Sequence, residues 1–270
     1  MSARRATGLL VVTAFVSMAW VAAHAQATTT KPFEPTVGQA GKDVVWVPTP
    51  QALVEKMLDL AKVTPQDFVM DLGSGDGRTV ITAAKRGAQA QGIEYNPDMV
   101  ELSKKNAAAA GVTGKANFVK ADLFETDFSK AQVVTMFLLP SINMRLRPQI
   151  LKMRPGTRVV SNTFTMEDWE PDTSETIGGD CTSWCTAHLW IVPAQVQGTW
   201  QAGQNALTLT QKFQKIDGTL GSTAITGGKL RGDEITFSVG GTKYAGKVNG
   251  NSISGTMSGG SSGSWSATKK

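Results

Sequence analysis

Residues 68–78 read FVMDLGSGDGR, and this stretch decides the fold. Apolar residues come first, an acid follows at Asp71, and glycines then occupy the alternate positions Gly73, Gly75 and Gly77. The pattern predicts a buried strand that ends in a tight turn and opens a helix, because glycine accepts the positive φ angles and close approach that such a turn needs. In Rossmann-like folds, a nucleotide-like ligand lies over a turn of this kind.

The spacing of the glycines narrows the choice of ligand. The dinucleotide fingerprint is G-x-G-x-x-G and is tuned to a pyrophosphate, whereas this chain has G-x-G-x-G with a carboxylate two residues before the first glycine. Asp71 would repel a pyrophosphate and would suit a ligand with a cationic ammonium group, such as S-adenosylmethionine. A tight turn without a ligand is the alternative for the motif alone, and the positions downstream decide between the two.

Beyond this stretch, apolar runs at strand spacing alternate with runs at helical spacing. Strands are expected at 88–94, 117–120, 133–137 and 157–164, and helices at about 50–61, 78–86, 97–110 and 141–153. Two further runs, 173–177 and 187–192, are expected to form a closing antiparallel pair. Alternation of this kind predicts an α/β fold with a Rossmann-like, doubly wound and mostly parallel sheet.

Candidate ligand contacts follow several of the predicted strands. Glu94 comes 21 residues after Gly73, the spacing at which Rossmann-like folds hold ribose hydroxyls with a carboxylate. Asp122 follows the next strand, and the segment 138–140 follows the one after it. Ligands of such sheets bind beyond the carboxyl ends of the strands, so these positions and Asp71 indicate one site. The alternative for Glu94 is an acid in a surface turn.

Residues 47–192 resemble the class I methyltransferases, and among them the lysine methyltransferases of the ATP synthase c-subunit and the adenine nucleotide translocator, with their bacterial relatives. The matching segments are Val47-Pro48-Thr49, residues 71–78, Gly92-Ile93-Glu94-Tyr95-Asn96-Pro97 and Asp122-Leu123-Phe124. The resemblance implies S-adenosylmethionine as cofactor and an acid after the third strand that faces the adenine amino group. The expected cofactor-binding residues are Asp71, Gly73, Ser74, Gly75, Gly77, Glu94, Tyr95, Asp122 and Leu123. No metal ligand is expected.

Methyl transfer from this cofactor is a direct displacement that needs an in-line nucleophile and a desolvated site. A lysine can lose its proton to water before it attacks, so no catalytic base is obligatory, and the sequence contains no evident catalytic dyad. Leu139-Pro140 lacks the Asn/Asp-Pro-Pro-aromatic motif of methyltransferases that act on adenine or glutamine. Phe137, Phe164 and Trp169 are candidates for an acceptor channel, although strand or core packing is the favoured interpretation of each.

Residues 1–25 have the pattern of a cleavable signal peptide. Arg4 and Arg5 precede the mostly apolar run 9–23, and an A-x-A pattern ends at Ala25. We therefore expect an exported protein, periplasmic or secreted, with cleavage after Ala25; an uncleaved anchor is the alternative.

The two cysteines, Cys181 and Cys185, lie four residues apart. In an exported protein they are expected to form a local disulfide, in the loop between the two closing strands and on the substrate side. Free thiols, or a metal site that includes His188, are the alternatives.

From residue 195 onward the chain has no helix signal and is rich in Gly, Ser and Thr. The segment 228–235 is echoed by 246–253, 18 residues on, and turn signals recur. The pattern predicts a small all-β domain of seven or eight antiparallel strands, a meander closed into a barrel or sandwich. Trp200 and Trp265 are interpreted as core residues of this domain, with a ligand platform as the alternative.

We therefore expect four regions: the signal peptide, a flexible leader at 26–43, a methyltransferase domain at 44–194 and the all-β domain at 195–270. The last of these holds eight Lys or Arg and three acidic residues, a net charge of +5, whereas 26–194 carries −2. The basic domain could hold an anionic envelope surface or simply be well solvated. No nucleic acid partner is expected.

Three functions compete at this point. The first is methyl transfer to a protein lysine, and the second is methyl transfer to a small molecule by the same fold. The third is an exported binding protein without catalysis, which export favours because S-adenosylmethionine is made in the cytosol. Intact cofactor motifs favour the first two.

Overall fold

The glycine stretch forms the strand, turn and helix that its sequence predicts. Strand β1 (Phe68–Leu72) lies inside a seven-stranded sheet with the order β3-β2-β1-β4-β5-β7-β6. Its pairs are parallel except those of β7, which runs antiparallel to β5 and β6. The other strands are β2 (Gln89–Glu94), β3 (Ala116–Lys120), β4 (Val133–Met136), β5 (Arg158–Asn162), β6 (Thr173–Thr176) and β7 (Thr186–Ile191). The doubly wound sheet and its closing pair are thus confirmed.

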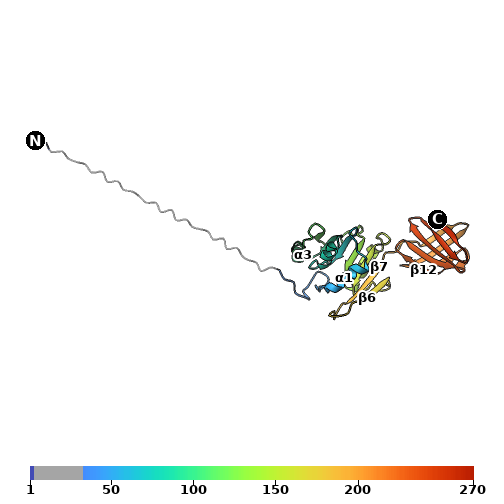
Figure 1. The fold of residues 1–270 in the computed structure, drawn as a ribbon, viewed down its shortest axis with the longest axis horizontal. Coiled ribbons are helices and arrows are strands. Elements are labelled where there is room, and N and C mark those ends of the chain that lie inside the picture. The colour runs from blue at the N-terminus through green and yellow to red at the C-terminus, as the bar shows by residue number, and fades with distance from the viewer. Residues whose placement is uncertain (3–32) are drawn as a thin grey trace. The chain divides into compact units, whose positions relative to one another are not determined.

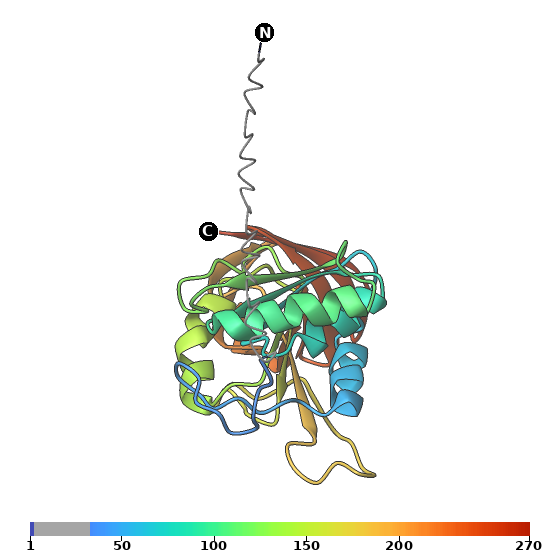
Figure 2. The same ribbon diagram turned by 90° about the vertical axis from the view of Figure 1, so that its left-hand side faces the viewer.

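Helices cover both faces of this sheet, which explains why its strands are apolar runs. The helices are α1 (Gln51–Leu60), α2 (Arg78–Lys85), α3 (Pro97–Ala109) and α4 (Pro140–Ile150). Successive strand residues point to opposite faces, so Val69 packs in the core under α1, α2 and α3, while Met70 packs in the core under α4. Figure 2 shows α1 in blue and α4 in yellow-green on opposite sides of the sheet.

The computed structural model describes residues 33–270 together with Met1 and Ser2. The predicted signal peptide and the first part of the predicted leader therefore lie outside the described residues, apart from those first two. Within the described part of the chain, no helix is both long enough and apolar enough to cross a membrane.

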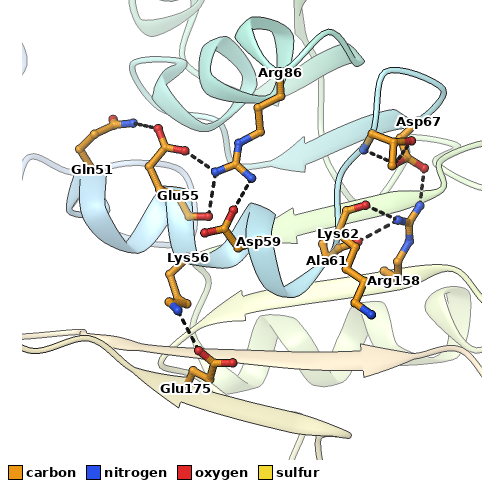
Figure 3. Close-up of polar contacts among 11 residues, drawn as sticks. Gln51, Glu55, Lys56, Asp59, Ala61, Lys62, Asp67, Arg86, Arg158 and Glu175 are labelled. Atoms are coloured by element: carbon orange, nitrogen blue, oxygen red, sulfur yellow. Dashed lines mark hydrogen bonds and ion pairs between the residues drawn. The ribbon is translucent and has the colours of Figure 1, made fainter.

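Helix α1 is held to the sheet by a set of polar contacts shown in Figure 3. The Arg158 guanidinium, on β5, donates to the carbonyl oxygens of Ala61 and Lys62 at 2.8 and 3.2 Å, and pairs with the Asp67 carboxylate. Burial opposes ionisation of Asp67, but hydrogen bonds from Arg158 and from the Thr64 amide outweigh it, and the pKa of that carboxyl is lowered. The end of α1 is therefore fixed against two strands.

The body of α1 carries a second set of ion pairs. Arg86, which follows α2, pairs with Glu55 and, at 2.7 Å, with Asp59. Lys56 reaches Glu175 on β6 at 2.9 Å, so α1 is tied to its neighbouring helix and to the sheet's edge strand (Figure 3). The Arg78 guanidinium also donates to the Thr49 carbonyl at 2.9 Å, which holds the segment that leads into α1 beside the turn after β1.

The chain from residue 198 onward forms a closed antiparallel barrel, drawn in orange and red in Figure 1. Its strands are β8 (Gly198–Ala202), β9 (Asn205–Lys212), β10 (Lys215–Leu220), β11 (Thr223–Ala224), β12 (Thr226–Arg231), β13 (Glu234–Val239), β14 (Thr242–Asn249), β15 (Ser252–Gly259) and β16 (Gly263–Lys269). Pairing of β9 with β10 closes the sheet, which removes exposed edges. Of the two predicted forms, barrel and sandwich, the chain adopts the barrel.

Both tryptophans of the barrel belong to its core, as the sequence indicated. The Trp200 side chain is fully buried and its indole N–H donates to the Val196 carbonyl at 2.8 Å. The Trp265 N–H donates to the Ala245 carbonyl at 3.0 Å. With their polar atoms already bonded inside the protein, these indoles serve packing.

The turn between β9 and β10 contacts the first sheet's connecting segments. The ring of Phe213 stacks on that of Trp169 with centroids 5.6 Å apart, and the Gln214 side chain donates to the Glu170 carbonyl at 2.8 Å. Residues 33–270 form one unit by their contacts. The domain boundary near residue 195 remains a prediction.

Candidate active site

A cavity of about 190 Å³ opens at the carboxyl ends of the strands, where the sequence placed the site. It is lined by eight of the nine predicted cofactor residues: Asp71, Gly73, Ser74, Gly75, Glu94, Tyr95, Asp122 and Leu123. Gly77 is not among the lining residues. It caps α2 with φ +83°, and a Cβ there would lie 2.7 Å from the Phe118 ring, so its role is in the turn.

Three successive amides of the glycine turn are bonded within the protein. Gly73 and Ser74 both donate their N–H groups to the Ile93 carbonyl, at 2.9 and 3.0 Å, and the Gly75 amide donates to the Glu94 carboxylate at 2.9 Å. A phosphate-binding turn would instead point such amides at the ligand. The donors and acids present therefore fit a cationic, phosphate-free ligand better than a dinucleotide.

Two observations show how closely the turn packs against the rest of the protein. Gly75 has φ +54°, and a Cβ at this position would lie 2.6 Å from the indole nitrogen of Trp46. The Ser74 hydroxyl oxygen is buried and has no hydrogen-bond partner among the described residues. This oxygen lies against Gly92 of β2, where a Cβ would be 2.4 Å from it, so the Ser74 side chain packs between the turn and the sheet.

Asp71 lies at the end of β1, opposite Thr135 on β4. The Thr135 hydroxyl donates to the Asp71 carboxyl at 2.6 Å. Burial raises the pKa of Asp71 to about 7, against the lowering effect of the Thr135 hydrogen bond and with help from the charges of Glu94 and Asp76. A carboxyl in this state ionises readily when a cation arrives beside it.

Glu94 is fixed at the end of β2 by backbone donors. Its two carboxylate oxygens accept from the amides of Gly75 and Asn96, each at 2.9 Å. A carboxylate has about four lone-pair sites, so Glu94 keeps acceptor capacity for ribose hydroxyls. The alternative of a surface turn acid does not fit, because Glu94 bridges the glycine turn and the next helix.

Asp122 is paired with a residue that sequence reasoning did not single out. The Lys42 ammonium bonds the Asp122 carboxylate and lies 4.8 Å above the Tyr95 ring. The hydrogen bonds from Lys42 and from the Phe124 amide lower the pKa of Asp122. Lys42 thus covers the end of the cavity where the adenine was expected.

The described part of the predicted flexible leader, residues 33–43, is held by hydrogen bonds to the segment that follows it. The Gly38 amide donates to the Trp46 carbonyl at 2.8 Å, and the Trp46 amide donates to Gln39 at 2.9 Å. The backbone therefore turns back on itself, and residues 39–49 line the cavity. The signal available in the sequence was the tryptophan in the apolar run 44–47.

The far end of the cavity is aromatic. The Phe137 ring stacks with Phe164 at 5.8 Å between centroids and meets the edge of Trp184 at 6.0 Å. All three line the cavity, so the packing interpretation is wrong for Phe137 and Phe164. It holds for Trp169, which is fully buried beneath Trp190 and Phe213 rather than at the site. Trp184 was missed.

Cys181 and Cys185 form the predicted disulfide in the loop between β6 and β7. His188 does not join them, because its ring nitrogens contact the Ser174 hydroxyl at 2.8 Å and the Thr163 carbonyl at 3.1 Å. No cluster of metal-ligating side chains occurs among the described residues. The loop lies on the substrate side, since its residue Trp184 lines the cavity.

Comparison with known proteins agrees with this geometry. Residues 71–173 match the sequence model of a family described as the ANTKMT methyltransferase domain. A protein-lysine N-methyltransferase of Saccharolobus islandicus is 48% identical over 131 residues, 47% of this chain and 81% of that protein. The lysine N-methyltransferase of the ATP synthase c-subunit from Mus musculus is 33% identical over 174 residues, 63% of this chain and 68% of that protein.

Among solved structures, an RNA methyltransferase from Salinibacter ruber in complex with S-adenosyl-L-homocysteine is similar. It is 47% identical, with a TM-score of 0.52, and the match covers 56% of this chain and 96% of that one.

The strand order, the glycine turn and these relatives define a class I methyltransferase that uses S-adenosylmethionine. Within that class the chain belongs to the family of the ANTKMT methyltransferase domain. The family match ends at residue 173 and so does not include the barrel.

Proposed function

We propose that this methyltransferase modifies the ε-amine of lysine in a protein. The observation that carries the proposal is the division of one cavity into a carboxylate end and an aromatic end. The lysine methyltransferases among its relatives support the same acceptor.

The cofactor would lie along the edge of the sheet in the order of the strands. Asp122 after β3 would accept from the adenine amino group, with Leu123 against the ring. Glu94 after β2 would accept from the ribose hydroxyls. Asp71 at the end of β1 would pair with the ammonium of the methionine part, which leaves the methyl group toward β4 and the aromatic end.

The reaction needs positioning more than acid–base catalysis. The lone pair of the neutral amine attacks the methyl carbon, the carbon–sulfur bond breaks, and its electron pair returns to sulfur, which becomes a neutral thioether. The methylated nitrogen carries the positive charge and then loses a proton to solvent. The protein contributes orientation and exclusion of water.

Calorimetric titration with S-adenosylmethionine and S-adenosylhomocysteine tests the cofactor site. We expect micromolar binding, and we expect Asp71→Ala and Glu94→Ala each to weaken it by about 1–3 kcal/mol, the effect of losing a hydrogen bond to a charged group. The matched control is Glu101→Ala, an exposed acid on α3 that pairs with Lys104. Unchanged affinity in both site variants would remove these assignments.

The acceptor is tested by mass spectrometry after incubation with S-adenosylmethionine and lysine-containing peptides, short RNA or small amines. Methylated lysine is the expected product. Methylation of RNA alone, the substrate class named for the Salinibacter ruber methyltransferase, would contradict the proposal. Methylation of small amines alone would instead favour a small-molecule methyltransferase of the same fold.

We also propose that the protein is exported and that its basic barrel holds an anionic envelope surface. The N-terminal pattern of residues 1–25, the Cys181–Cys185 disulfide and the net charge of +5 over residues 195–270 support this. Cell fractionation should find shortened protein outside the cytosol, and sedimentation with anionic vesicles should retain it at low salt. Full-length protein in the cytosol would overturn export.

A further inference from the structure

The loop between β6 and β7 exposes one large apolar side chain, that of Trp184, among mostly polar residues. Residues 178–183 read GGDCTS, and the Trp184 side chain follows them, 42% exposed and against Phe137. Its backbone has φ +55°, in the left-handed region that large side chains rarely adopt. The loop therefore holds a tryptophan in a disfavoured conformation at the entrance of the cavity.

Exposed apolar side chains gather at the same entrance. Large hydrophobic residues with more than a third of their side chain exposed include Val45, Tyr95, Leu139 and Trp184, and all four line the cavity. Exposed apolar groups grouped around one opening indicate a surface that another molecule covers. Leu139 and Trp184 flank the aromatic end, whereas Tyr95 belongs to the carboxylate end.

From these observations we propose that Trp184 positions the methyl acceptor, and that the Cys181–Cys185 disulfide holds it there. The acceptor is an amine on a protein segment whose neighbouring residues are large and apolar, so that they cover Leu139 and Trp184. This inference rests on the proposed function and specifies its substrate.

The aromatic end suits the two states of the acceptor. The aliphatic stem of a lysine packs between Phe137, Phe164 and Trp184, and apolar surroundings favour the neutral amine that attacks. The methylated, positively charged product is stabilised by the aromatic faces. Trp184 contacts acceptor and not cofactor, because the carboxylates lie at the other end of the strand order.

The disulfide matters because it restricts this loop. Its ring includes the residues 181–185, and Gly178 and Gly179 precede it with open space around them. When the bond is reduced, Trp184 can leave the left-handed region and the contact with Phe137. Acceptor binding then weakens, while the residues that bind the cofactor keep their positions.

The test uses two synthetic peptides with a single lysine, one flanked by two leucines on each side and the other by two serines. Methylation rates give KM and kcat for the full chain, for Trp184→Ala, Trp184→Phe and the double variant Cys181→Ser/Cys185→Ser, with Thr182→Ala as control. Thr182 is exposed, lies in the same ring and does not line the cavity.

We expect the leucine peptide to have the lower KM in the wild type, and Trp184→Ala to raise that KM about tenfold, as loss of an indole contact implies. Trp184→Phe restores part of the affinity, and the affinity for S-adenosylhomocysteine stays within about twofold, because no described contact of Trp184 reaches the carboxylates. A phosphine reductant reproduces the effect in the wild type and changes nothing in the double cysteine variant.

Equal KM values for wild type and Trp184→Ala, or equal preference for the two peptides, would overturn the inference. A second measurement separates it from the proposed function. Fluorescence anisotropy of the same peptides on protein saturated with S-adenosylhomocysteine reports acceptor binding without turnover. Tight binding that depends on Trp184 but yields no methyl-lysine refutes the proposed function alone, and binding that ignores Trp184 refutes the inference.

Discussion

At the scale of single residues, the buried carboxyl of Asp71 makes cofactor binding depend on pH. Its pKa is about 7, and the proposed partner is a cation, so the ionised form is the one that binds. Below pH 7 the cofactor must displace a proton, and affinity for S-adenosylmethionine should fall by up to about tenfold per pH unit. Calorimetry between pH 5.5 and 8.5 measures this.

The control for this pH dependence is Asp71→Asn, which keeps the shape and cannot ionise. It should bind more weakly above pH 7 and show a flat profile below it. A wild-type profile as flat as that of the variant would show that Asp71 does not face the cation.

Alanine substitutions at two glycines separate the effect of backbone strain from the effect of a steric clash. Gly75 and Gly111 have φ of +54° and +68°, so alanine at either should lower the free energy of unfolding by about 1 kcal/mol. Only at Gly75 would the new Cβ meet another residue, Trp46, since nothing lies within 4 Å at Gly111. We expect Gly75→Ala to abolish cofactor binding and Gly111→Ala to retain it. Retained binding in Gly75→Ala would contradict this account of the turn.

At the scale of elements, the anchor of α1 offers a test of stability. Arg158→Ala removes the partner of a buried carboxylate and two bonds to the end of α1, so the free energy of unfolding should fall by about 2–4 kcal/mol. Lys56→Ala, which breaks an exposed ion pair of the same helix, should leave it unchanged. Chemical denaturation compares the two variants, and equal effects would contradict the role given to Arg158.

The Asp67–Arg158 pair also makes the free energy of unfolding depend on pH in the acid range. The folded pKa of Asp67 is lowered, so its contribution is present above the pKa of the unfolded chain and is lost as the pH falls through the folded value. Arg158→Ala should therefore lose less stability than the wild type between pH 5 and pH 2.

The elements themselves were largely predictable from the sequence, because periodicity reports which face of a strand or helix is buried. The strands after Gly87 and before Asp122, and the closing antiparallel pair, form where their patterns indicated. The segment 33–47 was not predictable in this way, since it has no regular period and is held by turns and by a single tryptophan. Lys42 belongs to that segment, and its contact with Asp122 depends on tertiary structure alone.

At the scale of the whole molecule, the barrel is docked through Phe213. Phe213→Ala should lower the free energy of unfolding by about 1–3 kcal/mol, because the ring stacks on the buried Trp169. Methyl transfer should persist, since Phe213 does not line the cavity. Denaturation followed by tryptophan fluorescence measures the change, and Lys215→Ala, which breaks an exposed pair with Glu170, is the control.

How far the site could be read from the sequence also differs between its two ends. Motif spacing located the carboxylate end, because Asp71, Glu94 and Asp122 each lie at or just after the carboxyl end of a parallel strand. At the aromatic end, Phe137 and Phe164 were candidates but packing was favoured for both, and Trp184 was missed, because these residues follow β4, follow β5 and lie in a disulfide loop that no spacing rule connects. In the sequence, Phe137 and Phe164 have the pattern of strand residues. Only the folded structure shows that Phe137 contacts both Phe164 and Trp184.

The amides of Gly73, Ser74 and Gly75 are already bonded within the protein, and this affects which molecules can compete with the cofactor for the cavity. Most abundant nucleotides present phosphates, and this turn withholds donors from them while its carboxylates repel them. Competition is thereby limited to nucleosides without phosphate, foremost the demethylated product itself. We therefore expect the demethylated product to inhibit turnover more strongly than ATP or dinucleotides do.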